Sequence, residues 1–284
     1  MKKILAIMLS LILVVGLFAG CGNTTEEPKN NATPTETPTE APTQGATEAP
    51  VEGEAELKTV TPGKLTMATN AFFEPYEYYD GDKIVGIDAE IAEAIAEKLG
   101  LELVIDNMQF DSIITAVTTG AADFGLAGMT VTEDRLLEVD FSTSYAKGVQ
   151  VIIVKEGSAI TSYDDLAADG ATYKIGVQLG TTGNIYASDE FGDRVTPYNN
   201  GNEAVMALQA GDVDCVIIDN EPAKAFVAAN EGLTILESTY ADEDYAACFA
   251  QDNDALREAV NAAIEELIMD GTIDAIIEKY IPAN

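Results

Sequence analysis

The chain has 284 residues, and its 49 aspartate and glutamate residues against 15 lysine and arginine residues give a formal net charge of −34 at pH 7. Such an acidic chain is a poor partner for nucleic acid or for direct binding to an anionic lipid surface. The sequence contains no histidine, which excludes imidazole catalysis and histidine-ligated metal sites. No other motif indicates a metal or an organic cofactor, so we expect neither.

The first 20 residues have the pattern of an export signal. Two lysines precede the apolar stretch 4–18, and two small residues come before Cys21. The end of the stretch resembles a bacterial lipobox, which implies that Cys21 becomes the lipidated first residue of the mature protein. A plain secretory signal cleaved nearby is the alternative. Loss of Lys2 and Lys3 with the signal would change the formal charge from −34 to −36.

Residues 21–61 are predicted to form an extended, solvated tether. After the cysteine, this segment consists mainly of threonine, proline, glutamate, alanine and asparagine and contains no aromatic residue. A chain of this composition cannot bury enough apolar surface to fold. Its threonines are also compatible with O-glycosylation, which the sequence does not settle.

The remaining residues, 62–284, alternate between apolar runs and amphipathic patterns, which predicts α/β units with mostly parallel sheets. We expect strands at 64–69, 101–105, 123–127, 173–177, 194–197 and 213–218. We expect helices at 88–99, 111–119, 181–189, 202–210 and 222–229. Ile91, Ile95 and Leu99 fall on one face of the first of these helices.

Two segments of this part resemble each other. Residues 116–124 and 207–215 both have the pattern of a helix end, a glycine, a short turn, an aspartate and a buried strand. Many turns between a helix and a strand look alike, but each copy here precedes a candidate ligand group. Two similar lobes that face each other would bring these strand ends to a common cleft.

Arg135 is the first candidate for binding a ligand. It is one of three arginines in the chain and follows the apolar run 124–129. Thr130 and Glu133 have the spacing of a capping box, which predicts a helix start here with free backbone N–H groups. A guanidinium group matches a carboxylate bidentately, so we expect an α-carboxylate site. A surface ion pair with a neighbouring glutamate is the alternative.

Asp219 and a glycine-rich turn are further candidates. Asp219 follows an apolar run and precedes a proline-containing helix start, so it is either a helix N-cap or an acceptor for an ammonium group. The turn 180–183 (GTTG) opens a helix after a strand and offers N–H groups and hydroxyls to an anion. Phe73 and Phe110 lie near strand ends, where they either pack in the core or enclose a ligand side chain.

Five stretches in one order resemble the polar amino-acid-binding proteins of ABC importers, the bacterial extracellular solute-binding proteins of family 3. They are 86–91 (GIDAEI), 128–135 (GMTVTEDR), 139–142 (VDFS), 176–183 (GVQLGTTG) and 213–219 (VDCVIID). The resemblance covers residues 61–282. It implies a two-lobed type II periplasmic-binding-protein fold, in which two α/β lobes are joined by a two-strand hinge and close around one free amino acid.

The resemblance also implies roles for ten residues. Those that match the family's carboxylate-binding positions are Arg135, Thr130, Thr181 and Thr182. Those that match its ammonium acceptors are Gly128, Thr130 and Asp219. Those that match its aromatic walls are Phe73 and Phe110, and those that match the positions that select the ligand's side chain are Asn70 and Gln178. Members for basic amino acids commonly carry an acid at the Asn70 position, so the amide predicts a neutral polar ligand such as glutamine or cystine. Glu74 would overturn this prediction if it lined the pocket.

The implied lobes are 62–147 plus 246–284 and 148–245, with crossings near 145–149 and 241–245. The implied function is a monomeric receptor on the outer face of the cytoplasmic membrane of a Gram-positive cell. It would be anchored by lipid on Cys21, bind a free L-amino acid and deliver it to the permease subunits of an ABC importer. The chain would then not be an enzyme.

Two other functions and one disulfide stay open. The family resembles cyclohexadienyl dehydratases, which use the same fold with a carboxyl general acid, a role open to Glu74, Glu221 or Asp219. A ligand sensor for a separate signalling protein is the second possibility. Cys215 and Cys248 lie in apolar runs, which favours small buried side chains over a disulfide between them.

Overall fold

The computed structural model describes residues 57–282, so the predicted export signal, Cys21 and most of the predicted tether lie outside the described residues. Within this range, no helix combines the length and the apolar character needed to cross a bilayer. Backbone contacts begin near its start, where the N–H of Val60 donates to the Asp123 carboxylate at 2.6 Å.

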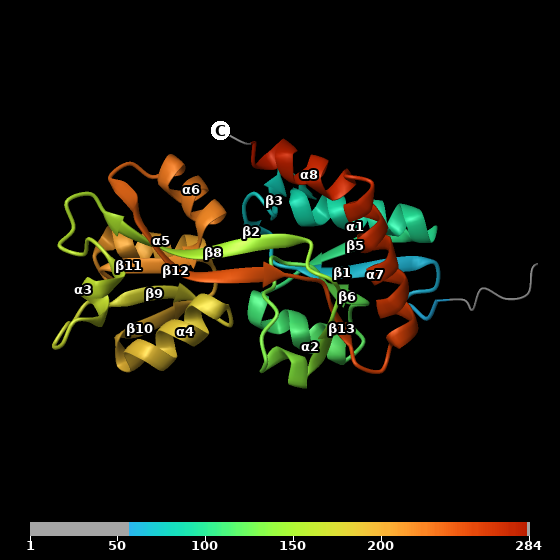
Figure 1. Ribbon diagram of the computed structural model, residues 1–284, viewed down its shortest axis with the longest axis horizontal. Helices are drawn as coiled ribbons and strands as arrows, with labels where there is room; N and C mark the ends of the chain where they lie inside the picture. The colour runs from blue at the N-terminus through green and yellow to red at the C-terminus, as the bar shows by residue number, and fades with distance from the viewer. Residues whose placement is uncertain (1–56, 283–284) are drawn as a thin grey trace, which may run out of the picture. The chain divides into compact units, whose positions relative to one another are not determined.

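Two five-stranded sheets and one small antiparallel sheet organise the described residues (Figure 1). The first has the order β5-β1-β6-β13-β7, with β1 Lys64–Thr69, β5 Glu102–Asn107, β6 Phe124–Gly125, β7 Val139–Phe141 and β13 Cys248–Ala250. The second has the order β10-β9-β11-β8-β12, with β8 Ala146–Lys155, β9 Ile175–Gln178, β10 Val195–Tyr198, β11 Cys215–Asp219 and β12 Leu233–Tyr245. The small sheet consists of β2 Phe72–Phe73, β3 Glu77–Asp80 and β4 Lys83–Val85. This arrangement confirms the predicted α/β class.

The large sheets are mixed, whereas mostly parallel sheets were predicted. Strand β1 pairs in parallel with β5 and β6, and β9 pairs in parallel with β10 and β11. Strand β8 runs antiparallel to both β11 and β12, and β13 runs antiparallel to β6 and β7. The physical reason is that β8 leaves the first lobe and β12 returns to it, so the two crossing strands have opposite directions.

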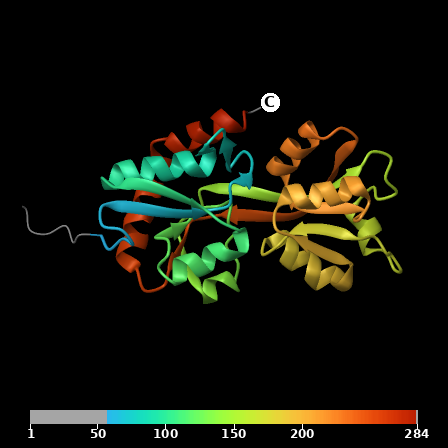
Figure 2. The same ribbon diagram turned by 180° about the vertical axis from the view of Figure 1, so that it is seen from behind.

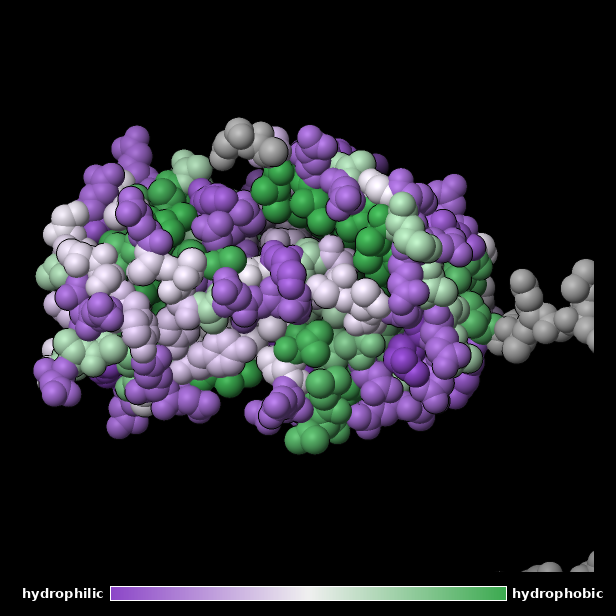
Figure 3. Space-filling view, in the orientation of Figure 1, coloured by the Kyte–Doolittle hydropathy of each residue, from purple (hydrophilic) through white to green (hydrophobic). Residues whose placement is uncertain are grey.

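Helices cover the faces of both sheets (Figures 1 and 2). Those of the first lobe are α1 Ile87–Leu99, α2 Ile113–Thr118, α7 Asp254–Met269 and α8 Thr272–Tyr280. Those of the second are α3 Tyr163–Ala167, α4 Thr182–Phe191, α5 Gly201–Ala210 and α6 Asn220–Ala229. Short 3₁₀ turns are η1 Phe110–Ser112, η2 Arg135–Leu137 and η3 Gly192–Arg194. Hydrophilic residues dominate the face shown in Figure 3, and the apolar side chains form separate cores on the two faces of each sheet.

The start of α1 is fixed by a close backbone approach. Gly86 has φ 125° and ψ −177°, a conformation that only glycine adopts readily, and a Cβ there would lie 2.3 Å from the carbonyl oxygen of Tyr76. The N–H of Asp88 donates to that same carbonyl at 2.9 Å. Ile91 and Ile95 are fully buried, as predicted for this helix. The close approach places the first turn of α1 beside β3.

Strands β8 and β12 lie side by side between the two groups of helices and form the predicted crossings (Figure 1). Glu243 pairs with Gly148, and Tyr245 pairs with Ala146. A Cβ at Gly148 would lie 2.3 Å from Cζ of Tyr245, so glycine is required for the ring to lie across β8. The strands divide between the two sheets in the way that the predicted lobes require, while the exact lobe limits stay a prediction.

Two local predictions have clear outcomes. No helix starts at Thr130 and the capping box with Glu133 is absent, because Thr130 forms a bridge with Tyr245 and only the turn η2 follows. The predicted strand 123–127 is reduced to β6, although its residues are buried. Cys215 and Cys248 are free and buried, and burial raises the pKa of each thiol to about 12.

Candidate functional site

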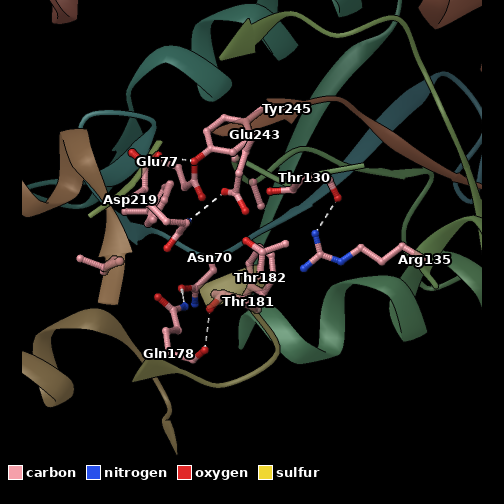
Figure 4. Close-up of a pocket in the computed structure, with 16 residues that line it drawn as sticks. Asn70, Glu77, Thr130, Arg135, Gln178, Thr181, Thr182, Asp219, Glu243 and Tyr245 are labelled. Atoms are coloured by element: carbon pink, nitrogen blue, oxygen red, sulfur yellow. Dashed lines mark hydrogen bonds between the residues drawn. The ribbon is translucent and has the colours of Figure 1, made fainter. Parts of the chain in front are cut away.

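A cavity lies where the ends of β1, β9 and β11 meet the crossing strands (Figure 4). It is lined by all ten residues that the sequence singled out: Asn70, Phe73, Phe110, Gly128, Thr130, Arg135, Gln178, Thr181, Thr182 and Asp219. Six more residues complete the lining: Glu77, Ala127, Gln150, Ile218, Glu243 and Tyr245. Both lobes therefore contribute to one cavity, and the roles of the individual residues stay predictions.

Arg135 provides the positive charge in the cavity lining. Its guanidinium group donates to the carbonyl oxygens of Thr130 at 2.7 Å and Gly180 at 3.0 Å, so it bonds to both lobes. It also lies over the Phe110 ring, 5.4 Å from the centroid. Burial lowers the pKa of Arg135 and the negative charge of Glu243 raises it, but guanidinium remains protonated in proteins. These contacts hold a planar donor group ready for an anion.

The N-terminus of α4 lies on the same side of the cavity. The Thr181 hydroxyl accepts from the Asn184 N–H at 3.3 Å as the N-cap and donates to the Gln178 carbonyl at 2.8 Å. The adjacent residue, Thr182, is the buried first residue of the helix. The first N–H groups of a helix lack partners within the helix and favour negative charge. Arg135 and this helix start therefore form the anion-attracting end.

Asp219 is a helix N-cap, as one of the two sequence interpretations predicted, and it also lines the cavity. One carboxylate oxygen caps α6 by accepting from the Glu221 N–H at 3.0 Å. The other accepts from the Tyr245 hydroxyl at 2.6 Å and the Val149 N–H at 3.0 Å, and the side chain lines the cavity. Burial raises the pKa of Asp219 to about 6, while these three hydrogen bonds lower it. The carboxylate is thus ionised at neutral pH and available to a cationic group.

Asn70 and Gln178 bond directly to each other across the lobes. The Gln178 amide donates to the Asn70 oxygen at 3.0 Å (Figure 4). The Asn70 amide donates to the Met108 carbonyl at 2.6 Å. The Gln178 side-chain oxygen is buried and has no hydrogen-bond partner in the part of the chain that the structure describes. Phe73 and Phe110 supply the aromatic wall. These neutral groups already satisfy part of one another's hydrogen bonding.

Glu77 and Glu243 are the two acids that sequence reasoning missed. Glu77 on β3 is fully buried, and neither of its carboxylate oxygens has a hydrogen-bond donor among the described residues. Glu243 on β12 accepts from the Gln150 amide at 2.9 Å through one oxygen, and its other oxygen lacks a partner. Burial raises the pKa of Glu77 well above its usual range, and the charge of Asp88 raises it further. Three carboxyl groups and one guanidinium therefore line the cavity.

The acid that the sequence analysis considered for this place, Glu74, does not line the cavity. It is exposed and lies in a shallower groove with Phe72 and Tyr79. The sequence did contain an indication that Glu77 is buried. It lies between two aromatic residues, Tyr76 and Tyr78, in a strand-like run. No group of three or more metal-ligating side chains occurs within residues 57–282.

The chain belongs to the bacterial extracellular solute-binding proteins, family 3, whose family model matches residues 65–283. Its structural neighbours include solved members of this group, which confirms the predicted fold. The relatives are named as binding proteins, which confirms the prediction that the chain is not an enzyme.

Three comparisons illustrate the similarity. The chain is 33% identical over 222 residues to the arginine-binding extracellular protein ArtP of Bacillus subtilis (strain 168), covering 76% of this chain and 86% of ArtP. It is 40% identical to an ancestral arginine-binding protein bound to arginine, with a TM-score of 0.71 and coverage of 77% and 98%. It is 38% identical to an ancestral arginine-binding protein bound to glutamine, with a TM-score of 0.73 and coverage of 78% and 100%.

We predict that Asp219→Ala lowers the stability of the protein more than Asp219→Asn does. Alanine removes the cap of α6 and the acceptor for Tyr245, and loss of an N-cap costs about 0.5–2 kcal/mol. Asparagine can still accept from the Glu221 N–H. Urea unfolding of the two variants without ligand measures the difference, and equal midpoints would contradict a capping role.

Proposed function

We propose that this protein is the extracytoplasmic receptor of an ABC importer and that its ligand is a free amino acid with a cationic side chain, with arginine as the first candidate. The observation that carries the ligand class is Glu77, a buried acid in the cavity lining whose two oxygens have no hydrogen-bond donor. A buried carboxylate is costly unless it is paired or hydrogen-bonded. A ligand cation would supply the missing partner.

The two ends of a zwitterion account for the other charged groups. Arg135 and the start of α4 suit the α-carboxylate, because fixed N–H donors from a guanidinium and a helix N-terminus converge there. Asp219 suits the α-ammonium group. A third charged group, Glu77, then remains for the side chain. A planar guanidinium could also stack on the aromatic wall formed by Phe73 and Phe110.

A neutral polar ligand, as predicted from Asn70, is the alternative. Asn70 and Gln178 offer amide groups, and one solved relative is an ancestral arginine-binding protein bound to glutamine. However, these amides bond to each other, and a neutral ligand would offer no charge to pair with an ionised Glu77. The arginine-binding relatives support the cationic class.

Delivery and location complete the proposal. The export-signal pattern of residues 1–20 and the family's extracellular description support a receptor outside the cytoplasmic membrane. We place a lipid on Cys21, a monomer at the membrane surface of a Gram-positive cell, and the permease subunits of the importer as its partner. Mass spectrometry of the mature N-terminus tests the lipid directly.

We predict that Glu77→Gln weakens the binding of L-arginine by about 2–5 kcal/mol, because truncating one partner of a buried charge pair costs that much. L-Glutamine should bind the variant at least as well as it binds the wild type. Glu74→Gln is the matched control, because Glu74 is an exposed acid three residues before Glu77 in the chain. Calorimetric titration with both amino acids gives the answer. Unchanged arginine affinity in Glu77→Gln would favour the neutral-ligand alternative.

We predict that Arg135→Ala abolishes measurable binding of every amino acid, because the α-carboxylate loses its buried counter-charge at a cost of about 2–5 kcal/mol. Arg135→Lys should bind weakly, since an ammonium group keeps the charge but not the planar fork. Arg257→Ala on α7 serves as the control, because Arg257 pairs with surface acids. Wild-type affinity in folded Arg135→Ala would remove the carboxylate role.

A further inference from the structure

Glu77 has a buried acidic neighbour that does not line the cavity. Asp88, in the first turn of α1, is fully buried, and one of its oxygens accepts from the Gly128 N–H and the Tyr145 hydroxyl, each at 2.8 Å. Its other oxygen has no hydrogen-bond donor among the described residues. The Asp88 N–H donates to the carbonyl oxygen of Tyr76, the residue before Glu77, at 2.9 Å, and the two buried carboxyl groups lie close enough for a proton on one to be shared with the other. Glu77 faces the cavity and Asp88 lies behind it.

The surroundings of this pair supply no positive charge. Burial raises the pKa of Asp88 to about 7, while the hydrogen bonds from Gly128 and Tyr145 lower it. No lysine or arginine within residues 57–282 is among the groups that shift the pKa of either acid. Apart from Arg135, the titratable groups that line the cavity or lie against the pair are acidic or phenolic: Tyr76, Tyr145, Asp219, Glu243 and Tyr245. Arg135 is the cation in the cavity lining, and the acid whose negative charge raises the pKa of Arg135 is Glu243.

Two adjacent carboxyl groups without a cation cannot both ionise at low cost, so they share a proton. Such a proton belongs to the pair as a whole, and the pair titrates with macroscopic pKa values. A cation that reaches Glu77 reverses the balance, because an opposite charge at hydrogen-bonding distance favours the ionised carboxylate. The second carboxyl group of the Glu77–Asp88 pair therefore ionises readily only when a ligand cation is bound.

We propose that binding of a cationic amino acid by this protein is coupled to release of a proton: the empty cavity holds one proton on the Glu77–Asp88 pair, and the ligand's side-chain cation displaces it to solvent. The inference rests on the proposed cationic ligand. Asp88 acts here as a positioning residue, since it sets the protonation of Glu77 without lining the cavity. The proton leaves as the cation arrives, so the charge of the pair plus its counter-ion is conserved.

The coupling has a defined direction with pH. Below the upper pKa of the pair, the empty protein holds the proton that the complex lacks, so a lower pH favours the empty form. The dissociation constant for L-arginine should therefore fall about tenfold between about pH 6 and pH 7. L-Citrulline, which has a neutral group in place of the guanidinium, should lack this dependence. Asp219 titrates near this range as well, but it faces the α-ammonium of every amino acid and affects both ligands.

Asp88→Asn isolates the pair. The amide oxygen can accept from the Gly128 N–H and the Tyr145 hydroxyl, and the amide nitrogen then occupies the place of the unpartnered oxygen and donates to Glu77. The variant should keep Glu77 ionised in the empty protein. It should bind L-arginine at least as tightly as the wild type does at pH 6, without the extra proton release.

Titration of L-arginine at pH 7 in buffers of different ionisation heat measures the protons released. We expect the wild type to release about one proton more than Asp88→Asn, with Glu74→Gln matching the wild type. Equal release by the wild type and Asp88→Asn would overturn the coupling while leaving cationic specificity intact. Failure of the wild type to bind L-arginine would remove the proposed function and this inference with it.

Infrared difference spectra of the wild type alone provide a test that needs no variant to fold. Addition of L-arginine should remove the band of a protonated carboxyl group, and addition of L-citrulline should leave it. A band that persists in the arginine complex would show that the pair keeps its proton and would overturn the inference.

Discussion

The site depends on one constraint. Its buried carboxyl groups are not all balanced by neighbouring cations or hydrogen-bond donors. Of the three carboxyl groups in the cavity, Asp219 receives three hydrogen bonds and Glu243 receives one from Gln150. Glu77 receives none from residues 57–282, and the carboxyl group beside it belongs to a second acid, Asp88. Burying a carboxylate in this way costs several kcal/mol unless it is neutralised or paired. In the empty protein a proton can neutralise Glu77, and in the complex a ligand cation can pair with it.

The crossing strands make the cavity a junction between lobes. Gln150 on β8 and Glu243 on β12 bond to each other and line the cavity, and the Tyr245 ring lies across β8 at Gly148 to reach Asp219. Direct contacts between the lobes include neutral ones, such as the bond between Asn70 and Gln178. A neutral hydrogen bond contributes only about 0.5–1.5 kcal/mol. A charged ligand that touches both lobes would therefore supply much of the difference that favours this arrangement.

Much of this site could be predicted from the sequence because strand ends in an α/β fold converge. Ten residues named from motifs line one cavity, and they follow β1, β6, β9 and β11 or lie beside these strands. The helix start predicted at Thr130 from the capping-box spacing was wrong, because Thr130 pairs with Tyr245 instead. That contact joins residues more than a hundred positions apart, which no local pattern reveals.

The missed acids show a second limit. Glu243 lies in the acidic run 242–244, which has the composition of an exposed segment, and only its register opposite Gly148 turns it inward. Glu77 is buried because the close approach at Gly86 places α1 against β3, so its environment depends on a tertiary contact. The prediction of a neutral ligand followed from the amides of Asn70 and Gln178. Glu77, a buried acid that local sequence could not place, changed the expected ligand class.

The most direct test of a cation at Glu77 is a crystal structure of the protein with L-arginine bound. The account predicts the guanidinium group within about 3 Å of a Glu77 carboxylate oxygen, with the α-carboxylate at Arg135. A side chain directed to Asn70 and Gln178, with Glu77 still paired to Asp88 and no cation beside it, would contradict it.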